Sequence, residues 1–283
     1  WSFSGLPPST PAADYSDAIV GQMYYNTSSG SFKAIKSGGA PIGTWSSGGT
    51  MNTARSDLSA AVFGPSSAGL GIGGYNPPGS PSARAITESY NGSSWTEVAD
   101  LNTGRWIAAG FGTQTSAVNS CGCTSDSSNF TAEAETWNGS SWTAAPDVNT
   151  TRRSYGASGA SSTSGLMFGG RNVPAYFAVT ESWDGSSWTE VGDLNTARAY
   201  MAGNGTQTSA VTASGLAPSP TTVSETWNGS SWTEITELST ARHDASMFGS
   251  GNTDAIISGG APNPKALTEY WDGSSWTEVA DRA

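Results

Sequence analysis

The chain has 283 residues, of which 36 are glycine and 12 are tryptophan, while only 12% are charged. This composition excludes extensive disorder, because disordered chains are rich in charge and poor in aromatic residues. The formal net charge of −11 argues against binding to nucleic acid, which needs clustered lysine and arginine. No apolar run of about 18 residues is present, so no membrane insertion is expected.

The first 44 residues differ from the rest of the chain. Residues 1–20 are rich in Pro, Ser and Ala and are expected to form an extended docking arm with a short helical turn near residues 12–19. They lack a basic region followed by a long apolar stretch, so they are not expected to be a signal peptide. Residues 21–44 are expected to form a β-hairpin and a linker, and residues 45–283 one repeat domain.

A repeat fills residues 45–283. Its clearest part, [WY]-[ND]-G-S-S-W-T, occurs five times, and a weaker sixth copy at Trp45 keeps only the second half. The tryptophan that precedes the threonine of the motif, together with Trp45, recurs at intervals of 50, 47, 46, 44 and 44 residues. These repeat tryptophans are Trp45, Trp95, Trp142, Trp188, Trp232 and Trp276. An arginine follows ten residues after each of the first five, giving the repeat arginines Arg55, Arg105, Arg152, Arg198 and Arg242.

Each repeat predicts four short strands. Asn-Gly or Asp-Gly between aromatic residues is a strong hairpin signal, because these residues accept positive φ. The third strand is therefore expected to end at Tyr90, Trp137, Trp183, Trp227 or Trp271, and the fourth to begin at the next tryptophan. Two Ala- and Gly-rich strands precede them, at 58–63 and 69–73 in the first repeat. Strands with such small side chains are expected to lie nearest the crowded axis of a propeller.

Four strands per period of about 45 residues predict an all-β fold, a β-propeller. Counting from arginine to tryptophan gives five four-stranded blades, with a closing strand from one end of the chain. Six blades are the alternative, if the hairpin at residues 21–35 joins residues 45–50 as a partial blade.

A glutamate also occurs once per repeat: Glu88, Glu135, Glu181, Glu225 and Glu269. A catalytic group should break the symmetry of a ring of repeats. The repeat glutamates, arginines and tryptophans are therefore expected to hold the scaffold together, as ion pairs or hydrogen bonds between strands or blades.

No catalytic residue, cofactor or metal site is predicted. The sequence lacks G-x-S-x-G, P-loop and H-E-x-x-H motifs. No acidic cluster outside the repeat suits glycoside hydrolysis. The single histidine, His243, and the neighbouring Cys121 and Cys123 make a poor metal set. We therefore expect a protein that is not an enzyme.

The repeat varies most between its second and third strands, at residues 75–84, 122–133, 171–178, 215–222 and 261–266. Variable loops on a rigid scaffold usually carry recognition. Aromatic and basic side chains that do not repeat are the predicted ligand-binding residues, and they suit a glycan or a protein partner. They are Tyr75, Phe130, Arg171, Tyr176, Phe177 and Lys265.

The pattern resembles the kelch repeat, in which a double glycine ends the second strand and an acidic residue, an aromatic residue and a spaced tryptophan follow. The double glycines are Gly73-Gly74, Gly169-Gly170 and Gly259-Gly260. They are replaced by Cys121-Gly122 and Ser214-Gly215 in the other two repeats. The resemblance implies a kelch-like propeller.

The hairpin at residues 21–35, the stretch GTWSSGGTMNTAR and the repeated GTQTSA segments are similar to kelch-like virion proteins of marine tailed bacteriophages. That resemblance implies a tail fibre, tip or head decoration on the virion surface. Its arm would bind other virion proteins, and its propeller would face a host-surface glycan or protein. A homo-oligomer would suit such a role. The alternative is a secreted, extracellular bacterial propeller that binds or acts on carbohydrate.

Overall fold

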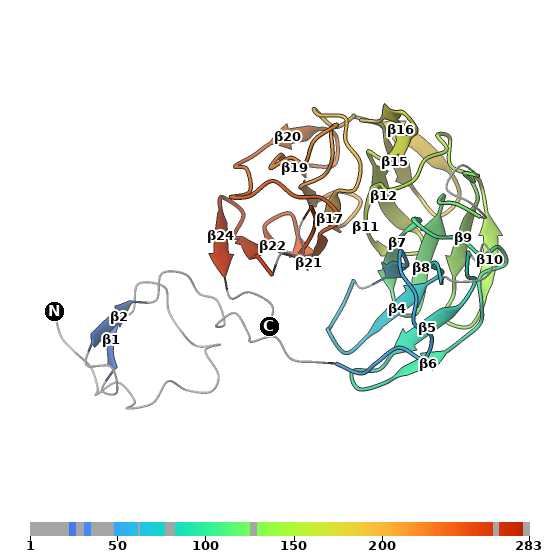
Figure 1. Ribbon diagram of the computed structural model, residues 1–283, viewed down its shortest axis with the longest axis horizontal. Helices are drawn as coiled ribbons and strands as arrows, with labels where there is room; N and C mark the ends of the chain where they lie inside the picture. The colour runs from blue at the N-terminus through green and yellow to red at the C-terminus, as the bar shows by residue number, and fades with distance from the viewer. Residues whose placement is uncertain are drawn as a thin grey trace. The chain divides into compact units, whose positions relative to one another are not determined.

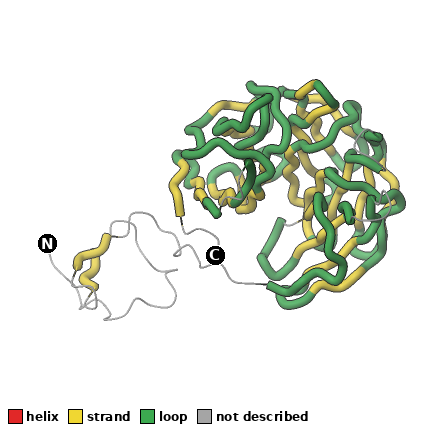
Figure 2. The backbone as a smooth tube through the Cα atoms, in the orientation of Figure 1, coloured by secondary structure: helices red, strands yellow, loops and turns green. Residues whose placement is uncertain are grey.

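The computed structural model describes residues 23–26, 31–34, 48–61, 63–76, 83–124, 129–262 and 266–279. The chain divides into two compact units, Trp1–Ser46 and Ser47–Ala283. The described residues form strands and loops and no helix (Figure 2), and so include no helix able to cross a membrane. The predicted arm, residues 1–20, and its helical turn lie outside them.

The described residues of the first unit form an antiparallel hairpin of β1 (Met23–Asn26) and β2 (Ser31–Ala34). Met23 lies opposite Ala34, and Asn26 lies opposite Ser31. Both strands fall inside the residues 21–35 for which a hairpin was expected.

The second unit contains five four-stranded antiparallel sheets, the blades of a β-propeller (Figure 1). We call them blades one to five. Blade one comprises β3 (Ser59–Ala61), β4 (Gly69–Ile72), β5 (Thr87–Tyr90) and β6 (Trp95–Glu97). Blade two comprises β7 (Ala109–Thr113), β8 (Ser116–Ser120), β9 (Ala134–Trp137) and β10 (Trp142–Ala145). Blade three comprises β11 (Gly156–Ser161), β12 (Ser164–Phe168), β15 (Thr180–Trp183) and β16 (Trp188–Val191).

Blade four comprises β17 (Ala202–Gly205), β18 (Ala210–Ala213), β19 (Ser224–Trp227) and β20 (Trp232–Glu234). Blade five comprises β21 (Ser246–Gly251), β22 (Asp254–Ser258), β23 (Thr268–Trp271) and β24 (Trp276–Val279). Blade three also carries a small extra hairpin, β13 (Arg171–Asn172) and β14 (Ala175–Tyr176).

The predicted fold, with its count of five blades, is confirmed. One detail was wrong: within the described residues, no blade is completed by a closing strand from the other end of the chain. Each blade takes its four strands from one continuous stretch, because a single repeat already contains four strands. The third strands end, and the fourth begin, at the aromatic residues predicted for them.

The hairpin between the third and fourth strands is stabilised by its own turn residues. In blade three, Asp184 Oδ1 accepts hydrogen bonds from the backbone N–H groups of Ser186 and Ser187, both at 2.8 Å. Gly185 follows with φ of 94°, a conformation that glycine adopts without strain. Asn138 makes the same turn in blade two. These hairpins are closed by local chemistry and need no ligand.

Apolar side chains bury the interface between each pair of successive blades. Between blades one and two, Leu70 and Ile72 of β4 pack with Trp137 and Trp142 of the next blade. The other three interfaces repeat this arrangement with the corresponding tryptophan pairs. In blades two to five, the ring centroids of the two indoles of a pair lie 5.1 to 5.5 Å apart. The tryptophans therefore belong to blade packing.

The repeat arginines and glutamates form buried ion pairs inside every blade. Arg198 pairs with Glu225, and both side chains are fully buried. Glu225 also accepts the backbone N–H of Asn195 at 2.8 Å, in the segment that enters the blade. The other four pairs have the same arrangement: Arg55–Glu88, Arg105–Glu135, Arg152–Glu181 and Arg242–Glu269.

Backbone hydrogen bonds also link successive blades. The second residue after each repeat arginine has positive φ, and in blades two to five its N–H donates to the carbonyl of the equivalent residue in the preceding blade. The donors Ile107, Ser154, Tyr200 and Asp244 do so at 3.0, 3.4, 2.6 and 2.9 Å. A branched residue such as Ile107 rarely adopts φ of 52°, so this chain of bonds holds a strained backbone.

The inner strands surround a central cavity of about 1010 Å³. They pack in the order β3, β7, β11, β17 and β21, but within the described residues no comparable packing joins β21 to β3. The last blade is accordingly uncovered on this side: Phe248 is 36% exposed, whereas Phe111, at the same register position in blade two, is 4% exposed. In the part of the chain that the structure describes, the five blades thus make four such interfaces.

The ion pairs predict a large loss of stability on removal of one partner. Arg198→Met leaves the Glu225 carboxylate buried without its cation, so the free energy of unfolding should fall by about 3–5 kcal/mol, measured by urea denaturation. Arg198→Met combined with Glu225→Gln should recover part of that loss. Exposed Glu190→Gln is the control, with an expected change of about 0.5 kcal/mol or less. A loss below about 1 kcal/mol in Arg198→Met would contradict a structural role for the pair.

The turn of blade three predicts a pH dependence. Hydrogen bonds from the side chain and backbone of Ser186 and the backbone of Ser187 lower the pKa of Asp184 from its usual 3.8 to about 2. The ionised carboxylate therefore stabilises the turn above about pH 4, and this stabilisation is lost as the pH falls toward 2. A carbon-detected NMR titration should give a midpoint near pH 2, and Asp184→Asn should keep the turn, as Asn138 does. A midpoint near pH 4 would show that the turn is not formed in solution.

Candidate functional site

The variable loops gather on one face of the propeller, which we call the loop face. Each blade brings three pieces of backbone together there: the residue after the repeat arginine, the residue after the double-glycine position, and the loop that returns to the third strand. In blade two these are Trp106, Cys123 and Phe130, which pair as two antiparallel bridges. The hairpins with the Asn-Gly or Asp-Gly turns leave the opposite end of the strands.

Side chains from neighbouring blades stack on the loop face. Tyr75 of blade one lies against Trp106 of blade two, with ring centroids 4.9 Å apart. The guanidinium of Arg153 lies 5.2 Å from the ring centroid of Phe130. Tyr200 lies 6.0 Å from His243, whose Nδ1 is 2.8 Å from an Asp244 carboxylate oxygen. This series of stacked rings and cations spans all five blades.

Blade three contributes the most distinctive part of the loop face. Its extra hairpin, β13–β14, ends in a tip where Val173 is 52% exposed. At its base, Arg171 pairs with Arg153 through two reciprocal backbone hydrogen bonds of 2.9 and 3.0 Å. The guanidinium of Arg171 lies 5.1 Å from the ring centroid of Tyr176 and 5.8 Å from that of Tyr200.

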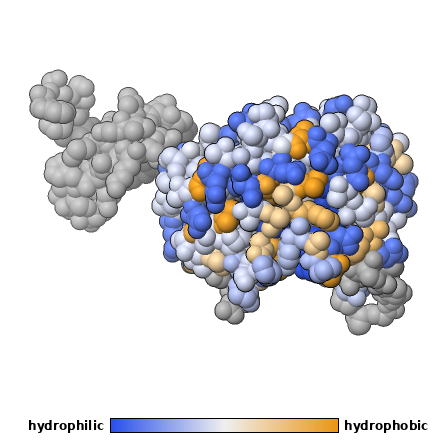
Figure 3. Space-filling view, turned by 90° about the horizontal axis from the view of Figure 1, so that it is seen from above, coloured by the Kyte–Doolittle hydropathy of each residue, from blue (hydrophilic) through white to orange (hydrophobic). Residues whose placement is uncertain are grey.

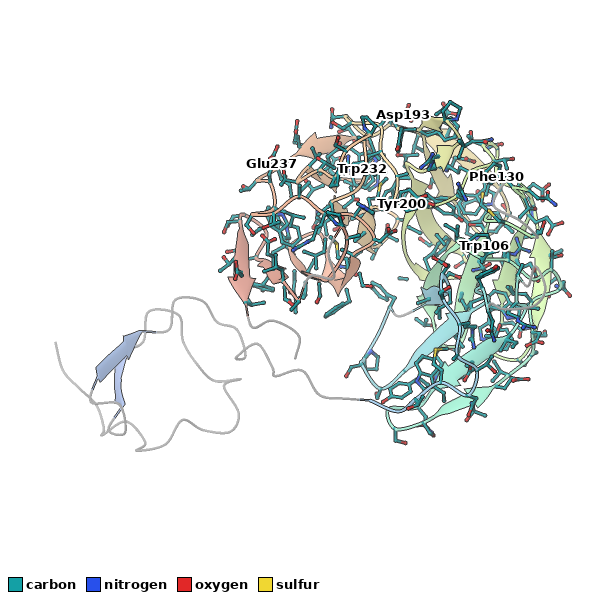
Figure 4. The ribbon with its side chains drawn as sticks, in the orientation of Figure 1. Trp106, Phe130, Asp193, Tyr200, Trp232 and Glu237 are labelled. Atoms are coloured by element: carbon teal, nitrogen blue, oxygen red, sulfur yellow. The ribbon has the colours of Figure 1, made fainter. Side chains whose placement is uncertain are left out.

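The labelled residues of Figure 4 show how this face relates to the rim. Tyr200 lies nearer the centre than Asp193 and Glu237, which lie at the outer edge. Both acids make local hydrogen bonds: Asp193 accepts the Thr180 backbone N–H at 3.2 Å, and Glu237 accepts the Thr222 hydroxyl at 2.5 Å. The side of the molecule in Figure 3 is mostly hydrophilic with interspersed hydrophobic residues.

The structure brings four of the six predicted ligand-binding residues into these contacts: Tyr75, Phe130, Arg171 and Tyr176. The Phe177 side chain is half-buried. Its backbone N–H donates a hydrogen bond to the Gly170 carbonyl, and its carbonyl accepts one from the Arg198 N–H. Lys265 lies outside the described residues.

Sequence reasoning missed four residues of the loop face. Trp106, Arg153 and His243 each follow a repeat arginine, and Tyr200 is the second residue after one. A signal was present, because both positions after the repeat arginine vary. The first reads Ser56, Trp106, Arg153, Ala199 and His243, and the second reads Asp57, Ile107, Ser154, Tyr200 and Asp244. These positions lie outside the variable loops between the second and third strands, where the binding residues were expected.

The central cavity is a weaker candidate site. Its lining consists largely of Gly, Ala and Ser from the inner strands, and Asp254 is the only carboxylate among its described lining residues. The chain as described also contains no group of three His, Cys, Asp or Glu side chains placed to hold a metal ion.

The two cysteines lie below the loop face in blade two. Both are buried, and neither forms a disulfide within the described residues. Burial raises the pKa of the Cys121 thiol to about 11, although the backbone N–H and charge of Arg152 oppose the rise. Cys121 is therefore protonated at neutral pH and unsuited to act as a nucleophile.

Comparison with known proteins supports the fold alone. No family model and no curated protein matches the chain. A solved structure, that of YjhT, matches with a TM-score of 0.60 over 80% of this chain and 84% of that chain. The two sequences are 12% identical, so the likeness does not extend to function.

Proposed function

We propose that this chain is a non-enzymatic binding protein, displayed on a bacteriophage virion, whose loop face recognises its ligand. One observation carries the binding role: residues that depart from the repeat converge on that face and stack across blade boundaries, as in the contact of Tyr75 with Trp106. A rigid scaffold that presents variable aromatic and basic side chains is suited to recognition.

The absence of catalysis is part of the proposal. Glycoside hydrolysis needs two carboxylates, or a tyrosine and an acid, that converge on one cleft. The repeat glutamates, which are the most regularly placed acids, are engaged in buried pairs with arginines. The repeat arginines are likewise committed to the scaffold.

The virion setting rests on the sequence resemblance to kelch-like phage proteins. In this proposal the chain is a tail fibre, tip or head decoration on the virion surface. Residues 1–20 attach it to other virion proteins, and the propeller contacts a host-surface glycan, a host protein or another virion subunit.

A secreted bacterial propeller that binds carbohydrate is the second candidate. The aromatic and arginine contacts of blade three favour it, because sugar rings pack on aromatic faces while arginine donates hydrogen bonds. The two candidates share a binding site and differ in the setting of the molecule.

A glycan array with the full chain tests the binding role. We expect specific binding that Tyr176→Ala reduces by about tenfold or more, because this ring contacts Arg171 and lines the face. Ser186→Ala, on the opposite hairpins, is the matched control and should leave binding unchanged. Release of hydrolysis products would overturn the non-enzymatic proposal.

Immunogold electron microscopy tests the setting of the molecule and should place the protein on phage particles. Its appearance in bacterial culture medium without phage would favour the secreted alternative.

A further inference from the structure

Blade three breaks the symmetry of the propeller at one pair of positions. Where it has Arg153 opposite Arg171, the other blades have Ser56 opposite Tyr75, Trp106 opposite Cys123, Ala199 opposite Leu216, and His243 opposite Ala261. No other blade places two cations there. A feature that the repeat does not require has to be explained by something other than the scaffold.

Neither arginine of this pair has an acidic partner among the described residues. The five repeat arginines all form ion pairs, but Arg153 and Arg171 form none. Arg153 is only 9% exposed, and its Nε has no hydrogen-bond partner within the described structure. Arg171 Nε also lacks one, as does the hydroxyl of Ser154, which is 8% exposed.

The backbone pairing places the two arginines side by side, each carrying one positive charge. Residues joined by two reciprocal backbone hydrogen bonds lie directly opposite each other, with Cα atoms about 5.5 Å apart and side chains on the same side of the ladder. Two neighbouring cations repel, and burial without a counter-ion is costly. An anion bound to both guanidinium groups would remove the repulsion and satisfy the free donors.

We propose that Arg153 and Arg171 form the binding site for the anionic group of an acidic saccharide. The planar guanidinium matches the oxygens of a carboxylate or phosphate. Tyr176 and Tyr200 flank Arg171, and Phe130 flanks Arg153, so a sugar ring would find aromatic faces beside its acid group. The proposal rests on the binding role of the loop face and specifies its ligand.

The charge of the protein limits how acidic that ligand is. The chain carries a net charge of −11, and exposed Asp57 and Asp244 lie on the loop face in blades one and five. A polyanion would be repelled by this surface. A saccharide with one anionic group meets the arginine pair without that repulsion, which favours it over a strongly acidic peptide.

Saturation-transfer NMR and calorimetry with the full chain test the proposal, using glucuronate, glucose 6-phosphate and neutral glucose as probes. We expect one or both acidic sugars to bind more tightly than glucose, and their relative affinities distinguish a carboxylate ligand from a phosphate ligand. Arg171→Gln and Arg153→Gln should each weaken binding of the acidic sugar by about tenfold or more. Arg171→Lys, which keeps the charge, should weaken it less.

Arg84→Gln is the matched control, because it removes the same charge from the corresponding loop of blade one, where the arginine also forms no ion pair with a described residue. The Arg84→Gln variant should bind the acidic sugar with the same affinity as the unchanged protein. Circular dichroism in the tryptophan region should show that all variants are folded. Arg171 is only partly buried, so its variant tests the site even if Arg153→Gln unfolds.

Equal affinity for glucose and both acidic sugars, or an unchanged affinity in Arg171→Gln, would overturn the proposal. Tighter binding of a pentaglutamate peptide than of either sugar would also overturn it. If Tyr176→Ala still abolishes binding on the glycan array in that case, the proposed function survives and only the anion site fails.

Discussion

The buried Arg–Glu pair is the interaction on which each blade depends. In every repeat, the glutamate of the third strand holds the arginine and accepts backbone N–H groups from the segment that enters the blade, as Glu88 does from Asn52 and Thr53. Burial alone would raise the pKa of Glu88, but Arg55 and these N–H groups together lower it. The carboxylate is thus kept ionised inside the blade, where it fixes the path of the connecting segment.

That path determines what the loop face presents. The residue directly after each repeat arginine emerges on this face at a constant place, so a change at that position alters the surface without altering the blade. The chain of backbone bonds through Ile107, Ser154, Tyr200 and Asp244 then fixes each blade against the preceding one. The side chains that build the scaffold repeat, whereas positions that are fixed only through their backbone vary.

The local parts of the fold could be predicted from the sequence. Turn chemistry and aromatic spacing gave the ends of the third strands and the starts of the fourth, because an Asn-Gly or Asp-Gly hairpin is encoded within a few residues. Among the described residues no packing comparable to the other interfaces joins β21 to β3, and this could not be predicted, since it depends on how far the blades curve as a set. Phe248 belongs to the same repeat position as Phe111, yet it is 36% exposed, whereas Phe111 packs against Trp188 of the next blade.

The candidate site was predictable only in part, for a related reason. Tyr75, Phe130, Arg171 and Tyr176 stood out as departures from the repeat inside variable loops. Their partners did not, because the pairing of Arg153 with Arg171 spans 18 residues and depends on the register of a loop whose length differs between blades. Cross-strand neighbours of this kind follow from the folded ladder and not from sequence spacing.

The central claim is that the scaffold repeats while recognition is confined to the loop face, and a chemical-shift map tests it most directly. Backbone amide spectra of the full chain should be recorded with and without glucuronate. We predict that the largest shifts fall on Arg153, Ser154 and the β13–β14 hairpin, with smaller ones at Phe130 and Tyr200. Shifts concentrated on the glycine-rich strands of the central cavity, or on the opposite hairpins around Asp184, would contradict the account.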